Sequence, residues 1–434
     1  MRKLLLIFQL LLKVKFIFKN PQEHELVIFD DESSIDLKNF ISCYNFFLLQ
    51  TRIENINKVY LSFQIIKYFF KYYNGNIMTA YLSSLLEIVR PKVVLTLIDN
   101  SLKFFDIAKI FNKKINFVAI QNGARYDLKR DKHLYKAKKI NSDLTKNYYI
   151  PNFLCFGQFE IDDYKENEIK VKNFSKVGSL RLANFFHHIE KNKISLKKSL
   201  YDICLISDPM PAGKSEKWDI PSLEEGFAKT MKYTIKFCMK HNMKMIFSWK
   251  RNKETVPKFH IGEQVFYKKH LNDIEFNYVV SNSIEKDKFS SYKAMFQSNI
   301  VVATYSTMLR ENLGIGGKIL SCNCTYSDIF DFPIEGICSI KNCNFQEFEK
   351  RLLDIHSISK ENYFSRLSKD KYYVMEYNEK VSTIEILRKK PLWELRVIIK
   401  ALSQPISSFL NTDEDNERLE NARKVLKERI ICQN

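Results

Sequence analysis

The sequence is poor in the two residues that most often interrupt regular structure, with only 11 glycines and 10 prolines among 434 residues. This scarcity excludes collagen-like, linker-like and low-complexity chains. Hydrophobic residues make up 45% and aromatic residues 14% of the chain, which excludes intrinsic disorder. A folding chain of this length predicts two globular domains.

Cysteines are also few, and their number, nine, is odd. They are scattered through apolar runs, which is typical of a reducing compartment and excludes a disulfide framework. Cys322 with Cys324, and Cys338 with Cys343, lack the CxxC spacing of a zinc site, and no histidine follows at finger spacing. We therefore expect no metal centre.

No apolar run at the start of the chain reaches the roughly 20 residues needed to span a bilayer. Residues 4–12 are largely apolar, but Lys13 and Lys15 end the run and no small-residue cleavage site follows, so a signal peptide is not expected. This helix either docks on its own domain or lies on an anionic membrane face. We expect a cytoplasmic protein, in the second case at the inner face of the cell membrane.

The net charge is +19, and most of the cations are lysines spread over the whole chain. This surplus has two interpretations: surface lysine that reflects composition alone, or attraction to an anionic partner such as a nucleotide-sugar, an acidic lipid surface or nucleic acid. Proteins that bind nucleic acid usually have their cationic side chains clustered in one surface stripe together with aromatic residues. The dispersed lysines therefore argue against a nucleic-acid partner.

Short apolar runs alternate with segments of helical period, which predicts α/β architecture with parallel sheets. Strands are expected at 26–29, 92–98, 116–120, 151–156 and 176–179, and in a second series at 202–206, 243–248, 299–304 and 317–321. Helices are expected at 57–74, 78–89, 102–112 and 221–241. Two such series predict two Rossmann-like domains facing a cleft, at 1–185 and 186–395, followed by a helical tail at 396–434.

In open α/β sheets, ligands bind beyond the carboxyl ends of the strands. Asp99, Asn100 and Ser101 follow the strand at 92–98, and a carboxylate held there suits a nucleophile or base. The alternative is that Asp99 caps the next helix. Glu54 also has two interpretations: it is either a second acid/base carboxylate or a residue in the first turn of a helix.

Polar side chains also follow the next strand, in the segment Gln121-Asn122-Gly123-Ala124-Arg125. The two amides can bond to hydroxyl groups, Gly123 lets a ligand approach the backbone, and Arg125 can pair with a carboxylate or phosphate. A plain Asn-Gly turn with a surface arginine is the alternative.

In the second series, Ser306 and Thr307 open a helix after the strand at 299–304, and Glu311 lies one and a half turns later. Hydroxyls at a helix start form an anion site fit for a phosphate, although they also cap many ordinary helices. Lys250 follows the strand at 243–248 and also has two interpretations: it either contacts a phosphate or belongs to an ordinary basic loop. The loop that starts at Asp208 is either part of the cleft or a plain connector.

Taken in order, these segments resemble a family of bacterial surface-carbohydrate biosynthesis proteins, and within it the GT-B-like retaining transferases that move Kdo from CMP-Kdo. The resemblance lies in residues 28–30, 51–57, 91–100, 120–125, 177–179, 305–311 and 316–318. The pairing of the strand that ends in Ile98-Asp99-Asn100 with segment 120–125 is its most specific part. The Ser…Glu element at 305–311 is shared by many nucleotide-sugar transferases.

The resemblance implies a glycosyltransferase in which Asp99 attacks or assists at the anomeric carbon and Glu54 is its acid/base partner. The residues implied to line the sugar pocket are Asn100, Gln121, Asn122, Gly123 and Arg125. Those implied to hold the cytidine monophosphate are Ser306, Thr307, Glu311 and Lys318, with Lys250 nearby. The acceptor would be a glycan or a lipid-linked glycan.

No metal-binding DxD motif follows a predicted strand; residues 160–163 and 413–415 are acidic runs expected to be solvated. Because cations and a helix N-terminus can stabilise a leaving phosphate, we expect activity without a metal or cofactor. A different enzyme activity, transfer of a polyol phosphate from a CDP-glycerol-type donor, usually needs a histidine base, and no histidine follows a predicted strand end. The chain could also be a non-catalytic polyanion-binding protein or a structural member of an assembly.

Overall fold

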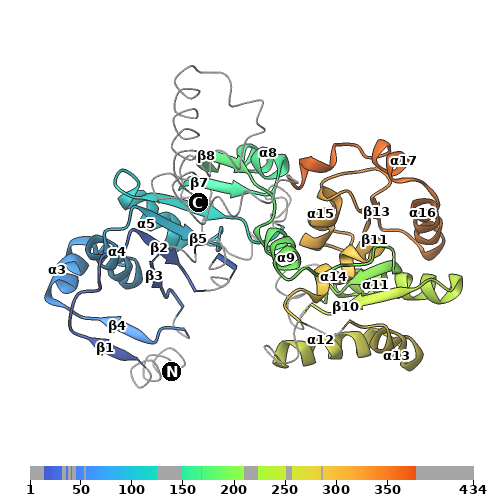
Figure 1. Cartoon of the computed structure of the whole chain (residues 1–434), viewed down its shortest axis with the longest axis horizontal. Coiled ribbons are helices and arrows are strands. Elements are labelled where there is room, and N and C mark those ends of the chain that lie inside the picture. Colours follow the sequence, from blue (N-terminus) through green and yellow to red (C-terminus); the bar gives the residue numbers. More distant parts are fainter. Residues whose placement is uncertain are drawn as a thin grey trace, which may run out of the picture.

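The computed structural model describes residues 14–31, 36–37, 41, 45–52, 55–124, 149–167, 169–209, 223–250, 257–284 and 287–377. They form two parallel sheets with helices packed against them (Figure 1), which confirms the predicted α/β class. The apolar segment at 4–12, Glu54, Arg125 and the tail at 396–434 lie outside the described residues.

The first sheet has six strands in the order β3-β2-β5-β6-β7-β8, and every neighbouring pair is parallel. The strands are β2 (Leu26–Phe29), β3 (Phe46–Leu49), β5 (Val93–Thr96), β6 (Asn116–Ile120), β7 (Tyr149–Cys155) and β8 (Lys170–Lys176). β2 and β5 are apolar and wholly buried, as expected of central parallel strands, whereas the edge strand β8 is largely polar and partly exposed. A separate parallel pair joins β1 (Lys15–Ile17) to β4 (Lys58–Tyr60).

Helices cover this sheet on both faces. α4 (Ile77–Val89) and α5 (Leu102–Phe111) bury apolar side chains against one face, with α3 (Phe63–Tyr72) beside α4. Leu37, Ile41 and the start of α9 (Leu180–Lys191) pack on the other face. The helix predicted at 57–74 starts only at residue 63, because 58–60 form β4. The strand predicted at 176–179 is also wrong beyond residue 176, because Ser179 is the N-cap of α9.

The second sheet has five parallel strands in the order β10-β9-β11-β12-β13. They are β9 (Tyr201–Ile206), β10 (Met245–Ser248), β11 (Ser298–Ala303), β12 (Lys318–Asn323) and β13 (Ser339–Lys341). The α-helices of this part are α11 (Leu223–His241), α12 (Pro257–His270), α13 (Asp273–Ser281), α14 (Ser290–Phe296), α15 (Thr307–Gly314), α16 (Phe345–Ser357) and α17 (Lys360–Ser365), and the short 3-10 helices are η1 (Asp328–Phe330) and η2 (Lys371–Tyr373).

The two halves share core residues. Phe156 and Phe159, around the start of α8 (Gln158–Glu166), and Leu182 and Phe185 of α9 belong to the core of the second sheet. In Figure 1, α9 lies between the halves, and the chain after α17 runs back toward α8. There the amide of Glu376 donates to the carbonyl of Phe156 at 2.7 Å. The predicted boundary at residue 185 therefore falls inside a helix that packs on both cores.

Each strand order reverses direction once. In the first sheet the chain passes from β2 outward to β3 and then to β5 on the other side of β2; in the second it passes from β9 to β10 and then to β11. Ligands of open α/β sheets bind at the carboxyl ends of the strands that flank such a reversal. These ends are therefore where a functional site is sought.

Candidate functional site

At the reversal of the first sheet, two aspartates follow the flanking strands: Asp30 after β2 and Asp99 after β5. Asp30 has a φ of 76° and is 5% exposed. Its carboxylate accepts a hydrogen bond from Thr51 Oγ1 at 2.6 Å and pairs with Arg52 Nε at 3.3 Å. Both partners follow β3, so Asp30 ties the ends of two neighbouring strands together.

Asp99 is fully buried at the end of the segment that follows β5, whereas the adjacent Asn100 is exposed. The helix-capping alternative for Asp99 is wrong, because the N-cap of α5 is Ser101, whose side chain accepts from the amide of Phe104. Asp99 thus lies buried beside the strand reversal, and its role as a reactive carboxylate stays a prediction.

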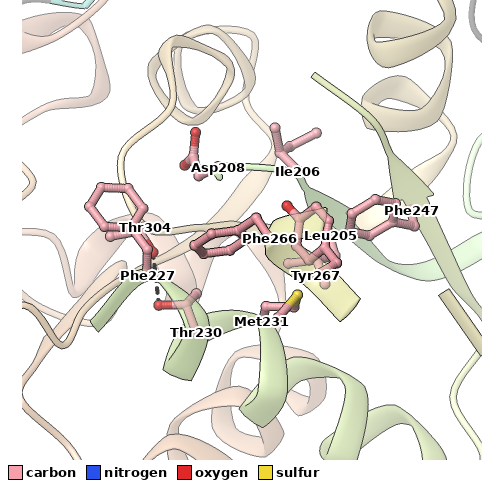
Figure 2. Close-up of a pocket in the computed structure, with 10 residues that line it drawn as sticks. All are labelled: Leu205, Ile206, Asp208, Phe227, Thr230, Met231, Phe247, Phe266, Tyr267 and Thr304. Atoms are coloured by element: carbon pink, nitrogen blue, oxygen red, sulfur yellow. Dashed lines mark hydrogen bonds between the residues drawn. The ribbon is translucent and has the colours of Figure 1, made fainter. Parts of the chain in front are cut away.

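At the reversal of the second sheet, a pocket opens between β9 and β11 (Figure 2). Its lining comes from both strand ends and from α11, α12 and β10: Leu205, Ile206, Asp208, Phe227, Thr230, Met231, Phe247, Phe266, Tyr267 and Thr304. In Figure 2, Asp208 lies across the pocket from Thr230, whose hydroxyl accepts from that of Thr304 at 2.9 Å. The pocket combines an apolar and aromatic lining with a few polar groups, but its volume of about 10 Å³ is only that of a single water molecule, so a larger ligand would have to lie outside it, beyond the strand ends.

Asp208 has the most informative electrostatics of this pocket. Its carboxylate accepts from the amide of Tyr305 at 3.0 Å and lies 3.5 Å from Lys250 Nζ. Burial raises the pKa of Asp208 to about 6, and the nearby ammonium only partly offsets that rise. Only the first residues of this loop are described, so both interpretations of it stay open; Lys250 lies beside Asp208 at the ends of the neighbouring strands β9 and β10.

The start of α15 joins the second sheet to the first. Ser306 is its N-cap and accepts from the amide of Met308 at 3.3 Å. Thr307 Oγ1 accepts from the amide of Ala124, in the loop after β6, at 2.8 Å. The predicted segments at 121–125 and 306–311, far apart in sequence, therefore meet at one place.

A buried polar network underlies this junction. Gln121 Nε2 donates to Glu160 Oε1 and to the carbonyl of Gly123, both at 3.0 Å, and Gln121 Oε1 accepts from the amide of Phe156. Glu160 in turn pairs with Arg310 of α15 at 2.5 Å, and both are 1% exposed. Glu160 is thus not solvated as predicted, because it is the counter-ion of a buried arginine.

Glu311 and Lys318 have different surroundings. Glu311 is buried between Ser179, which donates to it, and Tyr292, whose hydroxyl donates to it at 2.9 Å; burial raises the pKa of its carboxyl. Its Oε2 has no hydrogen-bond partner among the described residues. Lys318 is the first residue of β12, so it lies at the amino ends of the strands, opposite the carboxyl ends where the pocket is. Its ammonium donates to the carbonyls of Ile355 and Ile358 at the end of α16. That position does not fit the predicted contact with a nucleotide.

The structure also brings in residues that strand-end reasoning missed. Glu263 and Tyr267 of α12 flank the pocket and both contact Ser207, while the amide of Lys250 donates to Glu263 at 2.8 Å. His260, on the same helix, is 8% exposed, with its ring 5.3 Å from that of Trp249. They lie inside a helix rather than after a strand, so no strand-end pattern marks them.

Among the described residues, no helix is both long and apolar enough to cross a membrane. The structure is similar to a UDP-GlcNAc 2-epimerase from Neisseria meningitidis bound to UDP-GlcNAc (14% identity, TM-score 0.46, 86% of this chain and 99% of that chain). It is also similar to a glycosyltransferase from Rickettsia africae (10%, 0.41, 89% and 100%) and to the wall teichoic acid polymerase TagF (7%, 0.44, 88% and 91%). At such identities the likeness concerns the fold alone.

A search among curated proteins returned no match to this sequence. A family model does match residues 118–390, which is more than half of the chain and includes the loop after β6, the pocket and α15. The predicted relation to surface-carbohydrate biosynthesis is thereby confirmed: the chain belongs to the family described as "putative O-antigen biosynthesis protein".

Proposed function

We propose that this chain is a glycosyltransferase of surface-polysaccharide synthesis that transfers a sugar from a nucleotide-linked donor to a glycan or lipid-linked glycan. The observation that carries the proposal is the junction at α15, where the loop after β6 of the first sheet contacts the helix that follows β11 of the second. A donor held at one strand reversal would then lie close to a carboxylate at the other. Membership of an O-antigen family supports a glycan as the product.

The donor nucleotide is assigned to the second sheet. The nucleotide would lie beyond the carboxyl ends of β9 and β11, above the small pocket, whose hydroxyls are already bonded: Thr304 donates to Thr230, and Thr230 donates to the carbonyl of Cys322. Lys250 supplies positive charge, and the start of α15, with Ser306 and Thr307, adds the positive end of the helix dipole for a phosphate. Glu311 is 1% exposed and already accepts from Ser179 and Tyr292, so we assign it a supporting position behind the start of α15 instead of a contact with the nucleotide. Lys318 is not included, since it lies at the amino ends of the strands, away from the proposed nucleotide position.

For the chemistry we retain the donor and outcome that the sequence resemblance implies, a CMP-linked acidic sugar of the Kdo type transferred with retention. An Asp99 oxygen would bond to the anomeric carbon as the bond to the phosphate breaks and CMP leaves with the electron pair. The acceptor hydroxyl would then displace Asp99, giving up its proton to a base, for which Glu54 is the candidate. Since the leaving phosphate can be stabilised by cations and amides, no added divalent metal is expected to be needed.

The test is a nucleotide panel followed by transfer assays with the purified full chain. CMP should raise the melting temperature more than CDP, UDP or GDP. Asp99→Asn should lower transfer by roughly 100-fold or more, as for loss of an essential acid, base or nucleophile. Asp106→Asn, an exposed aspartate on the neighbouring α5, is the matched control and should stay near wild type. Normal transfer by Asp99→Asn would remove Asp99 from the chemistry.

One observation favours a second candidate, transfer of a polyol phosphate from a CDP-linked donor. That reaction usually relies on a histidine base, and His260 lies beside Trp249 on the helix that lines the pocket. A thermal shift larger with CDP than with CMP, together with loss of transfer in His260→Ala, would favour this candidate over the first.

A further inference from the structure

Three cysteine thiols converge beside the second sheet, next to the pocket: Thr230, which lines the pocket, donates to the carbonyl of Cys322 at 2.7 Å. Cys322 and Cys324 lie two positions apart at the end of β12, so their side chains point to the same face. Cys343 comes from the turn between β13 and α16. The three are 0%, 1% and 7% exposed. Among the described residues, this is the one group of metal-ligating side chains with three ligand atoms within 4.8 Å of one another.

The distances between the sulfurs are nearly equal. Cys322 and Cys324 Sγ are 3.7 Å apart, Cys322 and Cys343 3.8 Å, and Cys324 and Cys343 3.9 Å. A zinc–thiolate bond is about 2.3 Å long, so tetrahedral coordination places two thiolate sulfurs about 3.8 Å apart. A disulfide would need about 2.05 Å. The triangle thus has the dimensions of three corners of a tetrahedral thiolate site.

The backbone around the thiols is fixed by several independent contacts. Tyr326 and Asn342, in the turns after Cys324 and before Cys343, both have left-handed φ values, 57° and 45°. The amide of Tyr326 donates to the side chain of Asn342 at 3.0 Å, which ties the two turns together. Gly226 of α11 packs so closely that a Cβ there would lie 2.5 Å from the carbonyl oxygen of Cys324. The thiols are therefore held in a preorganised arrangement.

The local charge suits thiolates. Cys343 immediately precedes Asn344, the N-cap of α16, and the positive end of a helix favours a thiolate nearby. The ammonium of Lys229 of α11 lies 5.5 Å from the ring centre of Tyr326, two residues after Cys324, and 3.7 Å from the carboxylate of Glu225. A divalent ion with three thiolates carries one net negative charge, which Lys229 would offset.

We propose that Cys322, Cys324 and Cys343 form a tris-thiolate site for a thiophilic metal ion, Zn²⁺, whose fourth ligand is water or another external donor. Soft thiolates select zinc and copper(I) over magnesium, calcium and manganese. Zinc and copper(I) would both fit three thiolates at this spacing, and the metal-loading experiment distinguishes them. The ion would join the ends of β12 and β13 beside α11, the helix that also lines the pocket.

The test uses the full chain, purified under reducing conditions, incubated with one equivalent of Zn²⁺ and desalted. Elemental analysis should find about one zinc per chain. Cys324→Ser and Cys343→Ser should lose it, whereas Cys338→Ser, an equally buried cysteine on the neighbouring segment, should keep it. The same loading with Co²⁺ should give the thiolate charge-transfer band and the strong visible bands of tetrahedral cobalt.

Alkylation covers the case in which the serine variants do not fold. Because the three thiols are buried in the folded chain, alkylation is carried out in urea below the unfolding midpoint, where local opening lets iodoacetamide react. There Zn²⁺ should slow the reaction of these three cysteines but not of Cys338, and a chelator should abolish the difference, as located by peptide mass. Three outcomes would overturn the proposal: no retained metal in the reduced wild type, equal zinc in the wild type and both serine variants, or preference for copper(I) with no zinc bound.

Discussion

At the residue scale, Gly178 shows how strongly one position can depend on the absence of a side chain. Its φ is +71°, and a Cβ there would collide with the carbonyl oxygen of Glu376, which belongs to the segment that returns to the first half. Gly178→Ala should therefore combine left-handed strain with a backbone clash. We expect a loss of at least about 3 kcal/mol in the free energy of unfolding, measured by urea denaturation.

Two other glycines separate these effects. Gly75 also has a positive φ, +97°, but a Cβ there would have nothing within 4 Å, so Gly75→Ala should cost only the strain, about 1–2 kcal/mol. Gly262, inside α12, has open space as well, and alanine there should be neutral or stabilise by up to about 1 kcal/mol. Equal losses for Gly178→Ala and Gly75→Ala would contradict the predicted clash.

Asp208 leads to a prediction about pH. Its pKa is raised to about 6 by burial, above the value of about 3.9 in an unfolded chain, so the folded state holds the proton more tightly. Stability should therefore fall as pH rises from about 4 to 6. Asp208→Asn removes this penalty: relative to wild type, it should gain on the order of 2 kcal/mol between pH 4 and pH 7 in urea unfolding.

The control for this prediction is Asp354→Asn, whose stability relative to wild type should change with pH in the opposite direction. Arg366 forms two hydrogen bonds with Asp354, at 2.9 and 2.6 Å, and lowers the pKa of that carboxyl. Asp354 therefore contributes stability above its unfolded pKa that is lost on acidification. The free energy of unfolding of Asp354→Asn should fall further below that of wild type as pH rises. A flat difference for Asp208→Asn would show that its pKa is not raised.

At the element scale, the positions of the strands could be predicted well from the sequence, whereas the long-range contacts of individual side chains could not. The buried runs at 26–29 and 116–120 are the strands themselves, because a central parallel strand is apolar on both faces. The sequence places Glu160 in solvent because its burial depends on Arg310, 150 residues away. Spacing alone argues against a site at the three thiols, although folding brings Cys343 to Cys322 and Cys324. Local pattern predicts local structure, while site composition here depends on long-range contacts.

The pair between α8 and α15 gives the prediction at this scale. Arg310 and Glu160 are both 1% exposed and 2.5 Å apart, and the guanidinium also lies 4.8 Å from the ring centre of Phe159. Arg310→Met leaves a buried carboxylate without its counter-ion, which should cost about 3–5 kcal/mol. Adding Glu160→Gln should recover part of that loss. Arg366→Met, which breaks a solvent-exposed pair, should change the free energy of unfolding far less.

Denaturation of the single and double variants checks this prediction. If the double variant were as unstable as Arg310→Met alone, the unpaired charge would not be the cause, and lost packing against Phe159 would explain the effect instead.

At the scale of the whole molecule, the two sheets are built as one cooperative unit. Phe156, Phe159, Leu182 and Phe185 precede the second sheet in sequence but are buried in its core. In the other direction, the segment after η2 crosses back, where Glu376 bonds to Phe156 and pairs with Lys176 at 3.8 Å. Unfolding either half alone would therefore expose apolar surface of the other.

Calorimetry of the full chain should accordingly show a single transition, with a calorimetric enthalpy close to the van't Hoff enthalpy. Arg310→Met removes an ion pair that bridges the halves but leaves the shared core and the returning segment in place, so it should lower the melting temperature of this single transition without dividing it. Arg366→Met, within the second half, should leave a single transition. Two transitions already in the wild type would mean that the shared core and the returning segment do not couple the halves, because independent domains melt independently.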